Sequence, residues 1–369
     1  LTILGLFVVQ TFRIQIVEGE RYATAIEGQS IRREVIAPER GSLFDRRGQL
    51  LAGNAEFKTV VRGRERKLQR LHPWRNVGAV VLGTLGSTGS PLMGLEMSLD
   101  RELRGLEGWS TWRNDARGRK VNQVQGATKS AVAGLDVVLT IDKELQELVE
   151  GALHEGVEAV EGSRGVAIVL EPYTGEIMAM AVYPGFDPDD HTSLTPEKIR
   201  NDAITMLHEP GSVVKALTAA AALEENLISP KDTFDVSSGF YEIRGEKIRD
   251  SHKMGKLSFA DAIAKSSNVA FAQISERLGE KKLYQYLRSF GLGMRTGISL
   301  PGEEKGVLKQ VHEWSGRTLP TLAMGHELLV TPLQMVMAYG AIANGGLLMK
   351  PRLVREFRDS ETGELVRRE

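Results

Sequence analysis

The chain has 369 residues, of which 41% are hydrophobic and 26% charged, with a formal net charge of −1, seven histidines and no cysteine. This length and apolar content predict two or more folded domains and exclude disorder of the whole chain. The lack of cysteine excludes disulfides, the histidines lack metal-ligand spacing, and no Gly-rich phosphate loop precedes a helix, which argues against zinc and nucleotide enzymes.

The near-zero net charge hides an asymmetry between the two halves. Residues 11–135 hold 21 Lys and Arg against 13 Asp and Glu, a net of +8, which leaves −9 for residues 136–369. The stretch Arg62–Arg70 would suit an anionic membrane surface or a partner, although a solvated basic face is the simpler explanation. No aromatic residues interleave it, so single-stranded nucleic acid is not a favoured ligand.

The first nine residues are all apolar except Thr2, but a membrane-spanning helix needs about 20 apolar residues. The sequence also begins without methionine. We interpret residues 1–10 as the outer end of a truncated membrane anchor, with a buried N-terminal helix or strand as the alternative. The apolar spacing from Thr11 to Glu27 is compatible with the helix continuing as an amphipathic stalk.

The next hundred residues predict short elements. Residues 38–52 predict two short strands around an Asp-Arg-Arg-Gly turn, in which Gly48 can adopt a positive φ angle. Residues 70–109 predict an irregular α/β region without a long helix. Polar residues and glycine between Gln125 and Gly134 predict a domain boundary, after which Leu135–Ile141 is β-branched and apolar, as in a strand.

The second half begins with stronger signals. Asp142 is expected to cap a helix whose apolar residues continue to Val160. Gly165–Leu170 and Glu176–Val182 read as two strands of a hairpin, joined by a Pro-Tyr-Thr-Gly turn. Helices and hairpin strands in this order predict an α+β domain.

The most informative stretch is His208–Leu223. Pro210 and Gly211 end whatever precedes, and the Ala/Leu run after Lys215 predicts a buried, rigid helix that begins close to Ser212. Residues three apart share one helix face, so the Lys215 amine is expected beside the Ser212 hydroxyl. A neutral amine can take the proton of a serine nucleophile, and the helix N-terminus favours developing negative charge. A chance Ser-x-x-Lys spacing is the alternative.

A second candidate group lies at a predicted helix break. Residues 257–264 indicate one helix, and Ser266-Ser267-Asn268 interrupts it before a second helix that is expected to contain Ile274, Leu278 and Leu283. Ser266 and Asn268 can present a hydroxyl and an amide to one cleft, which suits proton relay and the binding of a peptide bond. Simple helix capping is the alternative.

These motifs together resemble a known family. Ser212-x-x-Lys215, followed by Ser266-x-Asn268, resembles the first two of three signatures of penicillin-binding proteins and serine β-lactamases. Five further segments resemble class B penicillin-binding proteins, and the resemblance covers about residues 11–369: they are 40–48, 94–96, 139–142, 172–177 and 331–334.

The resemblance implies a domain organisation. It assigns residues 1–10 to a truncated membrane anchor, 11–133 to a non-catalytic pedestal of the dimerisation type, and 134–369 to an α+β transpeptidase domain with an antiparallel sheet and helices. The pedestal looks reduced after Ala52. The third signature, Lys-Thr/Ser-Gly, is absent: Arg295-Thr296-Gly297 lies in a Gly-rich loop, and Glu361-Thr362-Gly363 in a terminal turn. We therefore expect that signature and further sheet strands beyond Glu369.

The resemblance also implies an activity and its residues. Ser212 would attack the D-Ala-D-Ala bond of a peptidoglycan stem peptide, Lys215 would accept its proton, Ser266 would relay a proton to the leaving amine, and Asn268 would hold the donor peptide. The Ser212 N–H would form half of an oxyanion hole. No metal or organic cofactor is implied.

The implied setting is the bacterial cytoplasmic membrane, with a single N-terminal anchor and the catalytic domain outside the cytoplasm. The implied partners are stem peptides, β-lactams, a membrane-embedded glycan polymerase and proteins of division or elongation, without nucleic acid. Two alternatives remain open at this point: a β-lactamase or β-lactam sensor that uses the same serine, and a non-catalytic scaffold of the division or elongation machinery.

Overall fold

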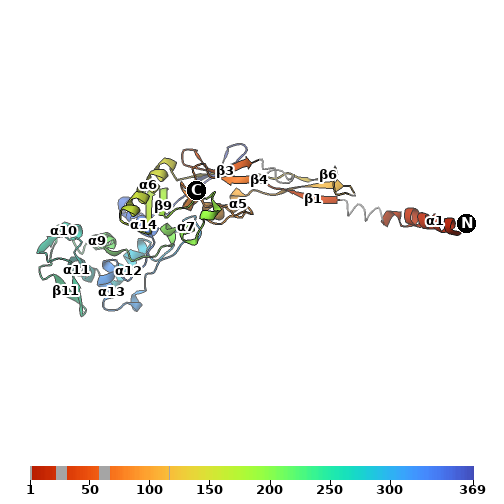
Figure 1. The fold of residues 1–369 in the computed structure, drawn as a ribbon. Coiled ribbons are helices and arrows are strands. Elements are labelled where there is room, and N and C mark those ends of the chain that lie inside the picture. Colours follow the sequence, from red (N-terminus) through yellow and green to blue (C-terminus); the bar gives the residue numbers. More distant parts are fainter. Residues whose placement is uncertain (1, 22–30, 58–66, 116) are drawn as a thin grey trace. The chain divides into compact units, whose positions relative to one another are not determined.

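The computed structural model describes residues 2–21, 31–57, 67–115 and 117–369 (Figure 1). Its contacts divide the chain into two units. The smaller unit comprises Leu1–Gly41, Arg101–Asp136 and Asp359–Glu364, and the larger unit comprises Ser42–Asp100, Val137–Arg358 and Leu365–Glu369. The predicted boundary at residue 134 does not coincide with these units, because residues 42–100 group with the later part of the chain. The predicted domain division stays a prediction.

The smaller unit begins with helix α1 (Thr2–Phe12), which continues into a π-helical segment, Arg13–Val17. The apolar side chains of α1 are exposed, among them Leu6 and Phe7, so the alternative of a buried N-terminal element is wrong for this structure. Within the described ranges, no helix combines the length and hydrophobicity needed to cross a membrane. Residues 22–27 of the predicted stalk lie outside the described residues.

The rest of the smaller unit is an antiparallel sheet in the order β1-β5-β6. Its strands are β1 (Ile31–Ile36), β5 (Gly108–Asn114) and β6 (Lys120–Lys129). The Arg33 guanidinium lies 3.9 Å from the centre of the Trp109 ring, and Lys120 Nζ lies 2.5 Å from Glu34 Oε2. Cross-strand contacts of this kind hold a sheet that has little buried apolar surface.

A six-stranded sheet in the order β15-β14-β7-β2-β3-β4 belongs to the larger unit. The strands are β2 (Leu43–Phe44), β3 (Leu50–Phe57), β4 (Lys67–Leu71), β7 (Asp136–Leu139), β14 (Val354–Arg358) and β15 (Leu365–Arg368). The predicted turn joins β2 to β3, and Gly48 has a φ of +84° there, as expected. Most of the basic stretch, residues 62–66, lies outside the described residues.

Helix α6 (Lys143–Ala159) packs on the hairpin of β8 (Gly165–Leu170) and β9 (Ile177–Tyr183). The Asp142 carboxylate accepts a 3.2 Å hydrogen bond from Leu145 N–H, which confirms the predicted cap. The side-chain amide of Gln146 bonds to both backbone groups of Met180, each at 2.8 Å. These two bonds fix the helix on the strand.

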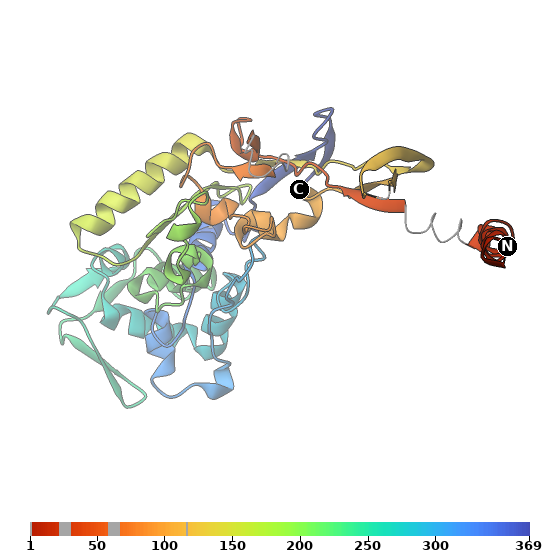
Figure 2. The same ribbon diagram turned by 45° about the vertical axis from the view of Figure 1, so that its right-hand side comes forward.

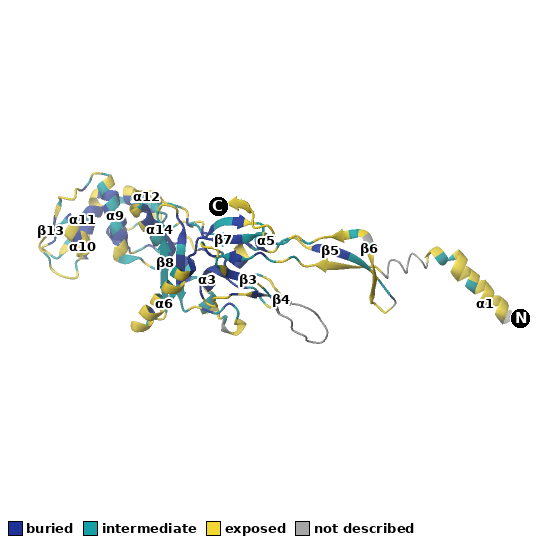
Figure 3. Ribbon diagram, turned by 90° about the horizontal axis from the view of Figure 1, so that it is seen from above, coloured by how far each residue is buried: buried dark blue, intermediate teal, exposed yellow. Residues whose placement is uncertain are grey.

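Four helices contribute to the hydrophobic core of the larger unit, together with buried residues of α10 (Phe259–Ala264) and α14 (Pro332–Ala343). The four are α9 (Lys215–Glu224), α11 (Asn268–Leu278), α12 (Glu280–Ser289) and α13 (Thr318–Ala323). Figure 3 shows the buried residues of α9 and α11, in contrast to the exposed α1. One expectation was wrong: Leu283 lies in α12 rather than α11, because Gly279, at φ +75°, ends the earlier helix.

The remaining elements are short, apart from α14, and their strands form two antiparallel pairs, β10–β13 and β11–β12. The β11–β12 hairpin extends from the helices in Figure 2. These elements are α3 (Ala79–Leu82), α4 (Gly94–Ser98), α5 (Asp100–Leu103), α7 (Pro196–Ile199), α8 (Asp202–Thr205), α10 (Phe259–Ala264), α14 (Pro332–Ala343), β10 (Thr233–Asp235), β11 (Phe240–Ile243), β12 (Glu246–Arg249), β13 (Lys256–Ser258) and three 3₁₀ helices, His191–Ser193, Gly211–Val214 and Val311–Glu313. Helices grouped beside mainly antiparallel strands confirm the predicted α+β class.

Candidate active site

Ser212 lies in the 3₁₀ helix Gly211–Val214, which runs directly into α9. The helix therefore begins where the sequence predicted. The Ser212 hydroxyl is exposed and forms no hydrogen bond to the described part of the chain. Because the first N–H groups of a helix have no acceptor within it, the backbone around Ser212 offers free donors. The residue combines an accessible hydroxyl with a locally positive backbone.

The Lys215 side chain is only 3% exposed, and its Nζ atom has three acceptors. Nζ donates to Ser266 O at 2.7 Å, to Ser266 Oγ at 2.9 Å and to Asn268 Oδ1 at 2.7 Å. The structure thus brings Lys215, Ser266 and Asn268 together, although 51 residues separate the first two in sequence. A Lys ammonium has three donors, so all of them are engaged.

Burial lowers the pKa of the Lys215 ammonium to about 8, and the negative charge of Asp250 acts in the opposite direction. With this pKa, roughly a tenth of the side chains are neutral at pH 7, against fewer than one in a thousand for an ordinary lysine. A neutral amine has two N–H donors and one lone pair. It can keep two of its present hydrogen bonds and accept a third from a neighbouring hydroxyl.

Ser266 follows α10 in the left-handed region, with a φ of +53°. This conformation is rarely populated by residues other than glycine and costs about 1–3 kcal/mol. It turns the chain so that both the carbonyl and the hydroxyl of Ser266 reach Lys215 Nζ. The predicted helix break therefore has a defined geometry that serves the lysine.

Ser267 and Asp250 hold this turn from behind. Ser267 caps α11 by accepting from Ala270 N–H at 3.1 Å, and its hydroxyl donates to Asp250 Oδ2 at 2.8 Å. The other carboxylate oxygen of Asp250 accepts from Val269 N–H at 3.1 Å. Sequence reasoning missed Asp250, because a single aspartate after a short strand carries no spacing signal that connects it to residue 267.

The backbone before Ser212 is held by a close approach to a distant glycine. Gly211 N–H donates to Gly325 O at 2.9 Å, and a Cβ atom on Gly325 would lie 1.9 Å from Gly211 O. Tyr339 Oη donates to Val213 O at 2.7 Å. Contacts from two later segments therefore fix the serine-bearing turn on both sides, which is the kind of support that a nucleophile requires.

Asn268 has both ends of its amide engaged. Its Oδ1 accepts from Lys215, and its Nδ2 donates to Arg249 O at 3.1 Å.

The backbone of Arg295-Thr296-Gly297, which resembles the missing third signature, is engaged by a neighbouring carboxylate. The Glu303 carboxylate accepts from Thr296 N–H at 2.6 Å and from Gly297 N–H at 3.1 Å. This loop is a self-contained turn that leaves few donors for a ligand.

No group of three or more His, Asp or Glu residues in the described ranges is arranged to hold a metal ion. The side chains at the site offer a chemistry of their own. An exposed hydroxyl, a buried amine of lowered pKa, a second hydroxyl on that amine and a side-chain amide form the set required for acyl transfer through a serine ester.

A model of the penicillin binding protein transpeptidase domain matches residues 165–368, which is more than half of the chain. Penicillin-binding protein PbpB of Mycobacterium tuberculosis is 36% identical over 297 residues, covering 79% of this chain and 43% of PbpB. Peptidoglycan D,D-transpeptidase FtsI of Escherichia coli is 30% identical over 298 residues, covering 81% of this chain and 50% of FtsI. The chain spans about half the length of the curated relatives it matches.

A solved structure agrees with these relatives. Penicillin binding protein 3 from Mycobacterium tuberculosis, in complex with aztreonam, superposes with a TM-score of 0.80 at 33% sequence identity. The superposition covers 91% of this chain and 70% of that one. The likeness extends well before residue 165, where the transpeptidase match begins, and so includes much of the N-terminal region.

Proposed function

Because the chain belongs to the penicillin-binding protein transpeptidase family, we propose that it carries the active site of a class B peptidoglycan D,D-transpeptidase. The observation that supports this most directly is the Lys215 amine, which is buried, has a pKa of about 8 and is held by Ser266 and Asn268. The relative named as a peptidoglycan D,D-transpeptidase, FtsI of Escherichia coli, supports the same reaction.

In the first half-reaction, Ser212 Oγ attacks the carbonyl carbon of the penultimate D-alanine while neutral Lys215 accepts the hydroxyl proton. Negative charge develops on the carbonyl oxygen, and the Ser212 N–H stabilises it. The C–N bond then breaks. The departing D-alanine nitrogen takes a proton from Lys215 through the Ser266 hydroxyl, which touches Lys215 Nζ. The products are a serine ester and free D-alanine.

In the second half-reaction, an amine from a neighbouring stem peptide attacks the ester carbonyl. The amine loses its proton to neutral Lys215, the ester C–O bond breaks, and Ser212 Oγ regains a proton from Lys215. One new amide cross-link replaces the amide bond broken earlier. Lys215 returns to its starting state, because the same group that accepted the first proton supplies the last one.

Asn268 is proposed to bind the donor peptide. Its Nδ2 has one hydrogen engaged with Arg249 O, and the second hydrogen can donate to a substrate carbonyl. A β-lactam presents a strained amide to the same serine. Its ring opens to leave an ester that occupies the site, which accords with the aztreonam complex of the similar solved structure.

The finer setting is also proposed. The exposed apolar side chains of α1 favour a place at a membrane surface, and we place the catalytic part outside the cytoplasm. A membrane-embedded glycan polymerase and proteins of division or elongation are the proposed partners. Residues 11–133 are proposed as a pedestal that does no chemistry, because the candidate site residues all follow residue 134.

Labelling with benzylpenicillin tests the active site. Intact-protein mass spectrometry should show one drug adduct on the wild-type protein, and peptide mapping should place it on Ser212. Ser212→Ala should remain folded by circular dichroism and gain no adduct. An adduct on the variant, or on another residue of the wild type, would remove Ser212 from the mechanism.

A further inference from the structure

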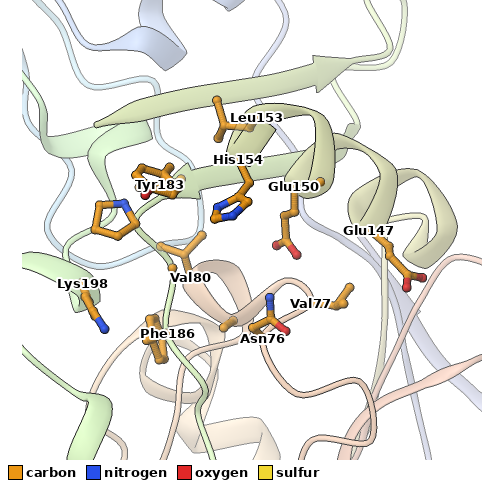
Figure 4. Close-up of a pocket in the computed structure, with 15 residues that line it drawn as sticks. Asn76, Val77, Val80, Glu147, Glu150, Leu153, His154, Tyr183, Phe186 and Lys198 are labelled. Carbon is orange, nitrogen blue, oxygen red and sulfur yellow. The ribbon is translucent and has the colours of Figure 1, made fainter. Parts of the chain in front are cut away.

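A cavity of about 380 Å³ lies between α6, the turn that precedes and includes α3, and the segment that follows β9 (Figure 4). It shares no lining residue with the candidate active site. Its volume falls within the range of about 300–1,000 Å³ that small-molecule sites occupy. The chemistry proposed above makes no use of it.

One end of the cavity is negative. Glu150 and Glu147 line it from α6, and Figure 4 shows the Glu150 carboxylate closer to its middle. Lys143 Nζ lies 2.7 Å from Glu147 Oε2 and neutralises that carboxylate in part. Glu150 has no such cation: its Oε1 accepts from Gly78 N–H at 2.9 Å and from the Gln146 amide at 2.8 Å, and its Oε2 is buried without a hydrogen bond to the described part of the chain.

The environment of Glu150 favours a cation. Burial raises the pKa of Glu150, and the nearby negative charge of Glu147 adds to the effect. A positively charged group at this end of the cavity would stabilise the ionised carboxylate and supply the donor that Oε2 lacks.

The other end is positive. Lys198, in the short helix α7, lines the cavity, and its side chain forms no hydrogen bond or ion pair with the described residues. Figure 4 shows it on the side opposite Glu147 and Glu150. Between the ends lie the apolar side chains of Val80 and Phe186 and the rings of His154 and Tyr183. The cavity therefore offers a carboxylate at one end and an ammonium group at the other.

We propose that this cavity binds a short peptide of two or three residues with free termini. The ammonium group would lie at Glu150, the carboxylate at Lys198, and small apolar side chains on Val80 and Phe186. A single amino acid holds its two charges too close together to meet both ends. Two or three extended residues hold the two charges roughly 7–10 Å apart, and Glu150 and Lys198 lie on opposite sides of the cavity (Figure 4).

Titration of the purified protein with trialanine, followed by NMR or calorimetry, tests the proposal. Trialanine should bind at least tenfold more tightly than N-acetyl-trialanine, which lacks the ammonium, and than trialanine amide, which lacks the carboxylate. Ser212→Ala should bind trialanine as the wild type does, which separates this cavity from the candidate active site.

Two variants assign the ends. Lys198→Met should weaken the binding of trialanine about tenfold and leave the affinity for trialanine amide unchanged. Glu150→Gln should weaken the binding of trialanine and leave the affinity for N-acetyl-trialanine unchanged. Lys281→Met and Glu155→Gln, which change exposed charges outside the cavity, are the matched controls. Lys198 is a half-exposed side chain without partners among the described residues, so its variant should fold even where Glu150→Gln does not.

Three outcomes would overturn the proposal. The first is no binding of trialanine at millimolar concentration. The second is equal binding of the free and capped peptides, and the third is wild-type affinity in a folded Lys198→Met variant.

Discussion

The three hydrogen bonds of Lys215 decide which substitutions can replace it. Arginine keeps the charge and can donate to Ser266 and Asn268, but it does not become neutral at ordinary pH. We expect Lys215→Arg to be nearly as damaging as Lys215→Ala, with acylation by benzylpenicillin slowed by about 10²–10⁴ in both. Stopped-flow or quenched-flow acylation rates measure this. A Lys215→Arg rate within a few fold of wild type would indicate that the lysine acts through its charge alone.

The pH dependence of acylation follows from the same residue. The reactive form of Lys215 is neutral, and its pKa is about 8. The acylation rate should therefore rise about tenfold for each pH unit below 8 and level off above it. The expected sign is a gain of rate with rising pH, since deprotonation creates the base. A rate that is flat between pH 6 and 9 would contradict a lysine base of this pKa.

Asp250 affects both the pKa of Lys215 and the turn before α11. Its charge raises the pKa of Lys215, and its two oxygens hold Ser267 and Val269. Asp250→Asn should move the midpoint of the acylation profile below pH 8 and lower the plateau rate, because the turn loses part of its support. Asp235→Asn, which changes an exposed carboxylate at the end of β10 that bonds to Ser237, is the matched control and should leave the midpoint in place. An unchanged midpoint in Asp250→Asn would limit this residue to a structural role.

Two glycines with nearly equal φ angles allow the cost of a left-handed conformation to be compared with the cost of a steric clash. Gly325 and Gly345 have φ values of +86° and +85°, but only at Gly325 would an added Cβ atom lie within 2 Å of other backbone atoms. Gly345→Ala should cost about 1–2 kcal/mol of unfolding free energy and leave acylation intact. Gly325→Ala should cost a further 1–3 kcal/mol or so and slow acylation, because the turn before Ser212 must shift. Chemical denaturation and acylation rates check both; equal effects of the two would show that the contact with Gly211 is unimportant.

Local signals in the sequence predicted the individual elements well. The Asp142 cap, the hairpin of residues 165–183, the start of the helix at Ser212 and the break at Ser266 all depend on neighbours in sequence. The contacts that support the site join residues far apart in sequence. Asp250 and Gly325 act through space on residues 17 and 114 positions away, and no local pattern marks such a pairing. The separation of α11 from α12 was missed because Leu283 continues the apolar spacing across Gly279.

At the scale of the whole molecule, one buried ion pair joins two parts of the larger unit. Arg70 Nε lies 2.6 Å from Glu96 Oε1, and the two side chains are 5% and 0% exposed. Glu96→Gln would remove a negative charge beside the buried arginine, so we expect the free energy of unfolding to fall by about 3–5 kcal/mol. Asp232→Asn breaks an exposed pair with Arg277 and should cost no more than about 1 kcal/mol. Urea denaturation compares them, and equal costs would contradict the assigned burial.

The six-stranded sheet has a consequence for how the chain is made. Its neighbouring strands β2, β7 and β14 come from residues 43–44, 136–139 and 354–358. A ribosome delivers these segments in order, at about 5–20 residues per second. During synthesis, β7 therefore waits for its β14 neighbour for roughly ten seconds or longer, with one edge unpaired. The helices around α9 and α11 form from nearer segments and can fold first, so the part of the chain that holds Lys215 should be assembled before the sheet is closed.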